Sequence, residues 1–126
     1  MLNNPNNPTG AVYPESVVSA MLDLARQHDV WLLSDECYDE VVHERQTVSP
    51  AGLAGAGGAG GAGVISAYSF SKTYAMTGWR LGYLAGPGGL VETVTKVLES
   101  QSSCASAMTQ NAAEAALTGP RTASRW

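Results

Sequence analysis

Two positively charged side chains lie close together in residues 66–83, among small, hydroxyl and aromatic side chains. Lys72 is one of only two lysines in the chain, and Arg80 follows it eight residues later. No acidic residue occurs between Glu44 and Glu92. Cations with no acid nearby in sequence are balanced either by carboxylates from distant segments or by a bound anion. The stretch is therefore a candidate anion site.

The same stretch supplies four hydroxyl side chains: Ser69, Ser71, Thr73 and Thr77. A lysine that can lose its proton, beside an arginine and hydroxyls that can hold a phosphate, is what a pyridoxal-phosphate enzyme needs. Such enzymes carry the cofactor as a Schiff base on lysine. The alternative is that both cations are ordinary solvated surface residues, as most lysines and arginines are. The residue types alone leave both interpretations open.

Composition and charge exclude several classes of protein. The chain has 126 residues, 44% hydrophobic and 14% charged, which indicates a globular domain or a piece of one. Its net charge of −4 argues against nucleic-acid binding, and no apolar run approaches the roughly 18–20 residues of a membrane span. Cys37 and Cys104 are far apart and histidines are few, so neither a disulfide framework nor a metal site is expected. A reducing cytoplasm is the expected location.

The first 40 residues predict a loop, a helix and a buried strand, in that order. Residues 3–10 contain only Asn, Pro, Thr and Gly, which is turn chemistry. Residues 14–29 place apolar side chains at helical spacing, and residues 30–34 predict a strand buried on both faces. An acidic cluster follows over 34–40. In an open α/β sheet this carboxyl end of a strand is where ligands bind, and Asp35, directly abutting the strand, is the candidate. The alternative is a solvated acidic loop.

Residues 51–63 are almost entirely Gly and Ala. The spacing Gly55-x-Gly57-x-x-Gly60 formally matches a dinucleotide-binding fingerprint. We reject that match because no apolar strand precedes it and a strand, not a helix, follows. A flexible surface connection is expected instead.

The second half of the chain predicts further strands and helices. Gly78 is expected to break any helical turn after Lys72. The last helix, over residues 105–117, is expected to stop at Gly119 and Pro120. Strands are expected over residues 64–68 and 81–86, and helices over residues 90–100 and 105–117. Helices that alternate with short apolar strands predict an α/β fold.

Three separated motifs together resemble one family. They are Asn4-Pro5-Asn6-Asn7-Pro8-Thr9-Gly10, Asp35-x-x-Tyr38, and Ser69-Phe70-Ser71-Lys72 with Arg80. Their order and spacing are similar to those of the class I/II aminotransferases, pyridoxal-phosphate enzymes of the aspartate aminotransferase fold (fold type I). The resemblance extends from residue 3 to about residue 119. It implies a partial three-layer α/β/α large domain with a mostly parallel sheet.

The resemblance implies a catalytic role for Lys72. This lysine would carry pyridoxal 5′-phosphate and, once displaced by substrate, would move the proton between the substrate α-carbon and the cofactor. Asp35 would pair with the pyridine nitrogen and keep it protonated, so that the ring withdraws electrons from the substrate α-carbon.

The resemblance implies that five further residues hold the cofactor. Arg80 would bind the phosphate through its planar, permanently charged fork of donors. Ser69 and Ser71 would add hydroxyl donors, with Ser69 the better match to the family. Tyr38 and Asn7 would hydrogen-bond to the 3′-oxygen of the cofactor. Taken singly, Arg80 would be a surface cation and Tyr38 a half-buried aromatic. Asn7 would be a turn residue and Ser69 a strand-end hydroxyl.

Complete members of the family contain parts that cannot be located in this chain. They begin upstream with a phosphate-binding loop and an aromatic that stacks on the pyridine ring. They end downstream with a small domain and an arginine for the substrate carboxylate. We therefore expect residues 1–126 to be an internal fragment of the large domain, with helices over 90–118 leading toward the small domain. The isolated chain is expected to bind the cofactor weakly and to transaminate poorly or not at all. The full-length form is expected to be a homodimer.

The predicted function is an aminotransferase that moves an amino group between an amino acid and a 2-oxo acid. A carbon–sulfur lyase or an aminocyclopropane-carboxylate-synthase-like enzyme of the same fold would share the lysine, the aspartate and the tyrosine. A third alternative is a non-catalytic remnant of a cofactor domain. The run Met76-Thr77-Gly78-Trp79-Arg80 resembles aminotransferases more closely than the lyases.

Overall fold

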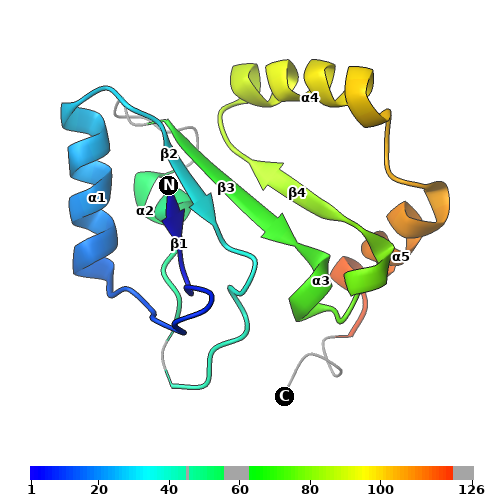
Figure 1. Cartoon of the computed structure of the whole chain (residues 1–126), viewed down its shortest axis with the longest axis horizontal. Coiled ribbons are helices and arrows are strands. Elements are labelled where there is room, and N and C mark those ends of the chain that lie inside the picture. The colour runs from blue at the N-terminus through cyan, green and yellow to red at the C-terminus, as the bar shows by residue number, and fades with distance from the viewer. Residues whose placement is uncertain (45, 56–62, 121–126) are drawn as a thin grey trace.

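The computed structural model describes residues 1–44, 46–55 and 63–120. Helices and strands alternate along the chain, as the sequence predicts (Figure 1). The elements are β1 (Leu2–Asn3), α1 (Glu15–Gln27), β2 (Leu32–Asp35), α2 (Pro50–Ala54), β3 (Val64–Ser69), α3 (Phe70–Thr73), the 3-10 turn η1 (Thr77–Trp79), β4 (Gly82–Ala85), α4 (Gly88–Ser102) and α5 (Ala107–Thr118).

The four strands form one sheet in the order β1-β2-β3-β4. The pairs β1–β2 and β2–β3 are parallel, and β3–β4 is antiparallel. The predicted mostly parallel α/β sheet is therefore confirmed. The register places Asp35 next to Asn3 on one side and next to Ala67 on the other. Because β1, β2 and β3 run in the same direction, the segments that follow them start at one edge of the sheet (Figure 1).

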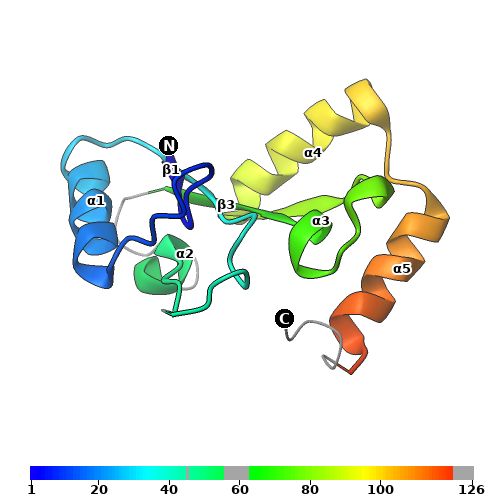
Figure 2. The same cartoon turned by 60° about the horizontal axis from the view of Figure 1, so that its bottom comes forward.

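Helices lie on both sides of the sheet. In Figure 2 helix α2 lies below β3 and helix α4 lies above it. The main core lies between α1, α2 and the first three strands, because α1 presents apolar side chains at positions i, i+4 and i+7. This confirms the predicted apolar stripe of the helix. The buried apolar residues of this core are Leu2, Val18, Leu22, Ala25, Leu32, Ala54 and Val64.

The prediction of a strand buried on both faces at residues 30–34 is wrong. Burial alternates along β2, and Leu33 is 37% exposed, whereas Leu32 is 8% exposed. Val30 and Trp31 lie before the strand and are more than half exposed. Leu32 belongs to the core that β2 shares with α1 and α2, whereas Leu33 lies on the opposite face of the strand. An apolar run alone does not report what covers the second face.

Two loop predictions also need correction. Residues 51–54, expected to belong to a flexible Gly/Ala connection, lie in helix α2, which starts with Pro50 at its first position. Proline suits that position and alanine favours a helix; residues 56–62, with Gly57 and Gly60, lie outside the described part of the chain. Gly78 does not break a turn after Lys72: α3 already ends at Thr73, and Gly78 lies inside η1.

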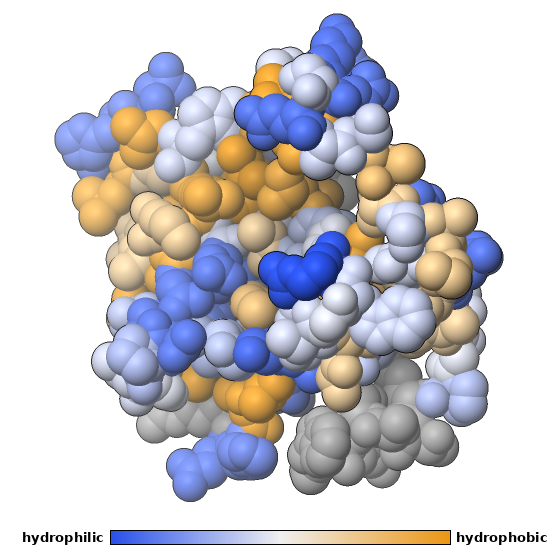
Figure 3. Space-filling model, turned by 45° about the vertical axis from the view of Figure 1, so that its right-hand side comes forward, coloured by the Kyte–Doolittle hydropathy of each residue, from blue (hydrophilic) through white to orange (hydrophobic). Residues whose placement is uncertain are grey.

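Helix α4 lies over the opposite face of β3 and β4, and an apolar groove of about 490 Å³ separates it from the sheet. Figure 3 shows apolar side chains gathered beneath this helix. The groove is lined by Ile65, Ala67, Tyr68, Gly82, Tyr83, Leu84, Leu90, Val91, Val94, Thr95 and Leu98. Within the described residues, no helix combines the length and the apolar character that a membrane crossing requires.

Candidate active site

The predicted site residues lie on segments that leave the strands at one edge of the sheet. Asp35 is the last residue of β2, and Tyr38 follows three residues later. Lys72 lies on α3, the short helix that begins directly after β3. Asn7 lies in the loop after β1, the strand that pairs with β2. This is the edge at which open α/β sheets bind ligands.

Lys72, Tyr38 and Asn7 meet in a chain of contacts between three segments. The Nζ atom of Lys72 lies 5.6 Å from the ring centroid of Tyr38. The Nδ2 atom of Asn7 donates a hydrogen bond to the hydroxyl oxygen of Tyr38 at 3.4 Å. An ammonium group over an aromatic face at an exposed site contributes about 0.5–1 kcal/mol. The arrangement therefore brings an amine, a phenol and an amide within reach of one small molecule.

Asp35 is partly buried and its carboxylate is held in one orientation. Its Oδ1 atom accepts a hydrogen bond from the backbone N–H of Cys37 at 3.1 Å. Its backbone oxygen accepts from the N–H of Asn4 at 3.1 Å and from Nδ2 of Asn3 at 3.3 Å. The Oδ2 atom accepts no hydrogen bond from the described residues. One carboxylate oxygen is therefore fixed by the backbone and the other is left for a donor from a ligand.

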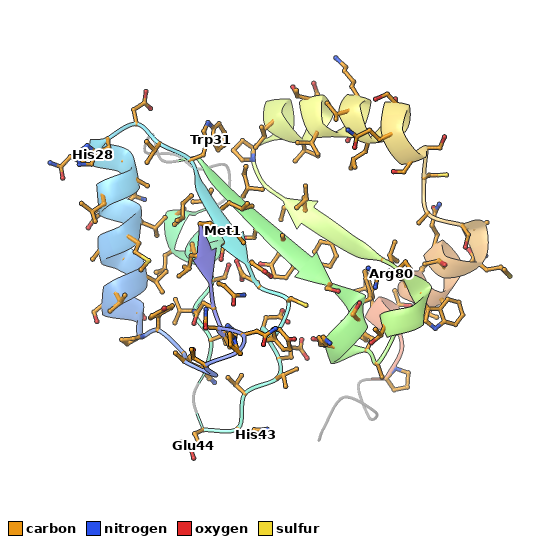
Figure 4. All side chains as sticks on the ribbon, viewed as in Figure 1. Met1, His28, Trp31, His43, Glu44 and Arg80 are labelled. Carbon is orange, nitrogen blue, oxygen red and sulfur yellow. The ribbon has the colours of Figure 1, made fainter. Side chains whose placement is uncertain are left out.

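Arg80 is linked to the lysine helix through two hydrogen bonds. Its Nη1 atom donates to the backbone oxygen of Thr77 at 3.1 Å, and Oγ1 of Thr77 donates to the backbone oxygen of Ser71 at 3.0 Å. Ser69 caps α3 by accepting the N–H of Ser71 at 3.1 Å. Figure 4 shows Arg80 where η1 passes into β4. Its backbone is left-handed, with φ 53° and ψ 51°.

Neither Lys72 nor Arg80 forms a salt bridge with any described residue. The salt bridge found among the described residues joins Arg26 and Asp23 on helix α1. Both Lys72 and Arg80 are exposed. The described residues therefore offer neither cation a carboxylate partner, and the exposure of both is what solvated surface cations and an anion site would equally show. The fit of the residues to a phosphorylated aldehyde therefore rests on an exposed amine, an unpaired guanidinium and the free oxygen of Asp35.

A cleft of about 600 Å³ opens between the loop after β1 and the loop after β2. Asn7 and Tyr38 line it; the other five predicted site residues do not. His43 and Glu44 also line it, and Figure 4 shows them together at the end of their loop, away from Arg80. The full lining is Pro5, Asn6, Asn7, Pro8, Gly10, Val12, Tyr38, Val41, Val42, His43 and Glu44.

Glu36 is a buried acid that sequence reasoning left within an acidic loop. It is 4% exposed, and its Oε1 atom accepts hydrogen bonds from Oγ of Ser66 at 2.6 Å and from Oγ of Ser49 at 3.0 Å. Its Oε2 atom accepts from the hydroxyl of Tyr68 at 3.1 Å. The available signal was alternation: Ser66 and Tyr68 are two residues apart and therefore share one face of β3.

Three ionisable side chains near this edge have shifted pKa values. Burial raises the pKa of Asp39, a residue whose carboxylate also accepts a hydrogen bond from Thr73. Burial likewise raises the pKa of the hydroxyls of Tyr68 and Tyr83, whose rings stack with centroids 4.8 Å apart. Asp39 and Tyr68 are partly buried and Tyr83 is 46% exposed, so these groups are shielded from water only in part.

Comparison with known proteins assigns the chain to a family. A family model described as aminotransferase class I and II matches residues 1–125. The chain belongs to this family. An aspartate aminotransferase from Rhizobium meliloti is 39% identical to it over 123 residues. A probable aspartate/prephenate aminotransferase from Thermus aquaticus is 38% identical over 118 residues. Each alignment covers at least 94% of the chain but 29% of the relative, so this aminotransferase-family chain spans under a third of their length.

Solved structures of aminotransferases share the fold. Thermus thermophilus aspartate aminotransferase, as a mutant complexed with tryptophan, superposes with a TM-score of 0.85 at 35% identity, covering 94% of this chain and 30% of that one. An aromatic aminotransferase from Pyrococcus horikoshii gives a TM-score of 0.85 at 35% identity, covering 95% and 31%. The predicted resemblance and fold are thereby confirmed. The roles of the seven individual site residues stay predictions.

Proposed function

We propose that this chain forms the cofactor-binding part of a pyridoxal-phosphate-dependent aminotransferase, which moves an amino group between an amino acid and a 2-oxo acid. One observation carries the proposal: the amine of Lys72 lies over the ring of Tyr38, at the sheet edge that also presents Asp35, in a member of this family. The related proteins are named for aspartate, prephenate and aromatic substrates.

The described residues supply a group for each part of pyridoxal phosphate. Lys72 would attach the aldehyde carbon, and the free Oδ2 of Asp35 would accept the pyridinium N–H. Arg80 would bind the phosphate, with the hydroxyls of Ser69 and Ser71 as further donors. When bound, the cofactor supplies an electron-withdrawing ring that makes the α-proton of an amino acid acidic.

The chain's own residues perform the positioning and the proton transfer. The ring of Tyr38 holds the amine of Lys72 at one place, and Asn7 fixes the direction of the Tyr38 hydroxyl. Lys72 would accept a proton at Nζ from the substrate α-carbon and then donate it to the cofactor. It would act first as a general base and then as a general acid. The Cys37 N–H keeps the carboxylate of Asp35 from rotating while the ring nitrogen stays protonated.

We further propose that the complete enzyme works as a homodimer in the cytoplasm. The support for the dimer is the family resemblance. The support for the compartment is chemical, because Cys37 and Cys104 are both free thiols and free thiols persist in reducing compartments. Size measurement of the purified complete protein and cell fractionation test these two statements.

The two lysines of the chain provide a matched test of the cofactor site. The purified chain is mixed with pyridoxal phosphate and reduced with borohydride, and peptide mass spectrometry locates the adduct. Lys96, on helix α4, is also exposed, so non-specific reaction would label both lysines. We expect an adduct at Lys72 in clear excess, and its loss in Lys72→Arg. Equal labelling of the two lysines would overturn the proposed function.

A turnover assay separates the reaction classes. The complete enzyme, supplied with amino donors and 2-oxoglutarate, is expected to form glutamate. Release of pyruvate and ammonia from cystathionine without a 2-oxo acid acceptor would instead identify a lyase. The isolated chain is expected to show little of either reaction.

A further inference from the structure

A second contact joins the two loops that bring Lys72 and Tyr38 together. The Oγ1 atom of Thr73 donates a hydrogen bond to Oδ1 of Asp39 at 3.3 Å. Thr73 directly follows Lys72, and Asp39 directly follows Tyr38. Two consecutive residues of one segment therefore contact two consecutive residues of another, 34 positions away. Thr73 is buried, at 7% exposure, so this contact lies beneath the exposed lysine.

Asp39 is held firmly on its own side of the contact. Its N–H donates to the backbone oxygen of Glu36 at 3.1 Å, and its backbone oxygen accepts from Oγ1 of Thr47 at 2.8 Å. The Oδ1 atom that accepts from Thr73 also accepts the N–H of Glu40 at 3.0 Å. The acceptor is thus fixed in place. The Asp39 side chain is partly buried, and this burial raises the pKa of its carboxyl.

Helix α3 cannot hold the lysine in place by itself. It has four residues, Phe70–Thr73, and a single helical turn is not stable without tertiary contacts. Ser69 caps its first turn. The Thr73 hydroxyl is the polar side-chain contact that joins its last residue to the loop after β2. The buried side chain of Phe70 and the hydrogen bond from its N–H to the backbone oxygen of Leu81 also anchor α3, and the Thr73 bond adds the link to the loop that carries Tyr38.

We propose that Asp39 and Thr73 are positioning residues, whose hydrogen bond holds the amine of Lys72 over the ring of Tyr38. The inference rests on the proposed function in one respect, that Lys72 is the amine to which the cofactor attaches. It adds a residue pair outside the three motifs on which the family resemblance depends. Neither residue touches the reacting atoms.

The test measures how selectively pyridoxal phosphate reaches Lys72 over Lys96 after borohydride reduction. Thr73→Val keeps the shape and removes the donor, and Asp39→Ala removes the acceptor. Each is expected to lower the Lys72 to Lys96 adduct ratio about fivefold, as loss of one partly exposed hydrogen bond would. Thr73→Ser keeps the donor and Asp39→Asn keeps an acceptor, so each of these variants should have the adduct ratio of the unaltered chain. Thr93→Val, an equivalent change on exposed α4, should leave it unchanged.

The double variant Thr73→Val, Asp39→Ala provides a second, independent measure. Because both residues act through one bond, the double variant should lower the ratio no further than either single variant does. Circular dichroism confirms that each variant is folded at the assay temperature, and Thr73→Ala replaces the valine variant if that variant unfolds.

The possible outcomes separate this inference from the proposed function. Equal capture at Lys72 and Lys96 in the unaltered chain contradicts the proposed function itself. Preferred capture at Lys72 that persists in both disruptive variants leaves the function standing and refutes the positioning role. Loss of preference that Thr73→Ser and Asp39→Asn fail to restore also refutes it, because the shared hydrogen bond would then not be the cause.

Discussion

Removing the side chain of Glu36 is expected to destabilise the fold by about 3 kcal/mol. The change Glu36→Ala removes the carboxylate that accepts from three hydroxyls, those of Ser49, Ser66 and Tyr68, and leaves the longer 3.4 Å contact between the hydroxyls of Ser49 and Tyr68. At about 1–1.5 kcal/mol for each lost hydrogen bond the sum is about 3–4.5 kcal/mol. Relief from holding a charge in a poorly solvated place offsets part of this loss. The lower end of the range is therefore the expected value.

Two conservative changes give the matching controls. Glu36→Gln keeps an acceptor oxygen for Ser66 and Ser49 and removes the buried charge, so its cost is expected to be about 1 kcal/mol or less. Ser66→Ala removes one bond and is expected to cost about 1–1.5 kcal/mol. The three variants should therefore rank Glu36→Ala first, Ser66→Ala second and Glu36→Gln last.

The assay is urea unfolding at neutral pH, monitored by far-ultraviolet circular dichroism. The midpoints are compared only if the dependence of the unfolding free energy on urea concentration is the same for all variants. Near-ultraviolet signals from the stacked rings of Tyr68 and Tyr83 report the same region locally. An unfolding free energy for Glu36→Ala within about 0.5 kcal/mol of the unaltered chain would refute the reasoning. So would a larger loss for glutamine than for alanine, because an acceptor network cannot favour the truncated side chain.

Three further predictions concern charge and pH. Burial raises the pKa of Asp39 above 3.8, so protonation of this carboxyl stabilises the fold at low pH, and that stabilisation is lost as the pH rises through the folded pKa. Asp39→Asn should therefore be more stable than the unaltered chain at neutral pH. In acid unfolding curves this advantage should disappear below pH 3.8. Burial also raises the pKa of Tyr68 above 10.0, so stability should fall as pH rises past 10, and less steeply in Tyr68→Phe; parallel alkaline curves for the two proteins would contradict this. Arg80→Gln should weaken capture of pyridoxal phosphate at Lys72 about tenfold while leaving capture of pyridoxal, which lacks the phosphate, unchanged; an equal loss for both aldehydes would show that the guanidinium does not read the phosphate.

The periodicity of apolar residues and the order of the motifs were enough to predict most of the helices and strands and the edge of the sheet at which the site lies. The apolar spacing of α1 and the polar residues after β2 are local signals, and the structure brings Asp35, Tyr38 and Lys72 to one edge through strand direction alone. The exposure of Leu33 was not predictable, because the sequence of a strand does not say which of its faces another element covers.

The hydrogen-bond partners of Glu36 and Asp39 could not be read from the sequence. Glu36 meets Ser66 only through the register of β2 against β3, which the residues between them do not encode locally. The contact between Asp39 and Thr73 depends on two turns that meet in space but lie 34 positions apart. The short helix α2 was hidden for another reason: its alanines and glycines also suit a flexible connection.

The left-handed backbone at Arg80 has a consequence for protein engineering. A residue with a Cβ atom at φ 53° costs of the order of 1–2 kcal/mol relative to a glycine, which adopts that conformation freely. Selection for thermal tolerance alone would accordingly drift toward glycine or asparagine at this position. A stabilised lineage obtained in that way would hold its shape at higher temperature and release a phosphorylated ligand more readily. Library screens on this chain should therefore score ligand retention together with melting temperature.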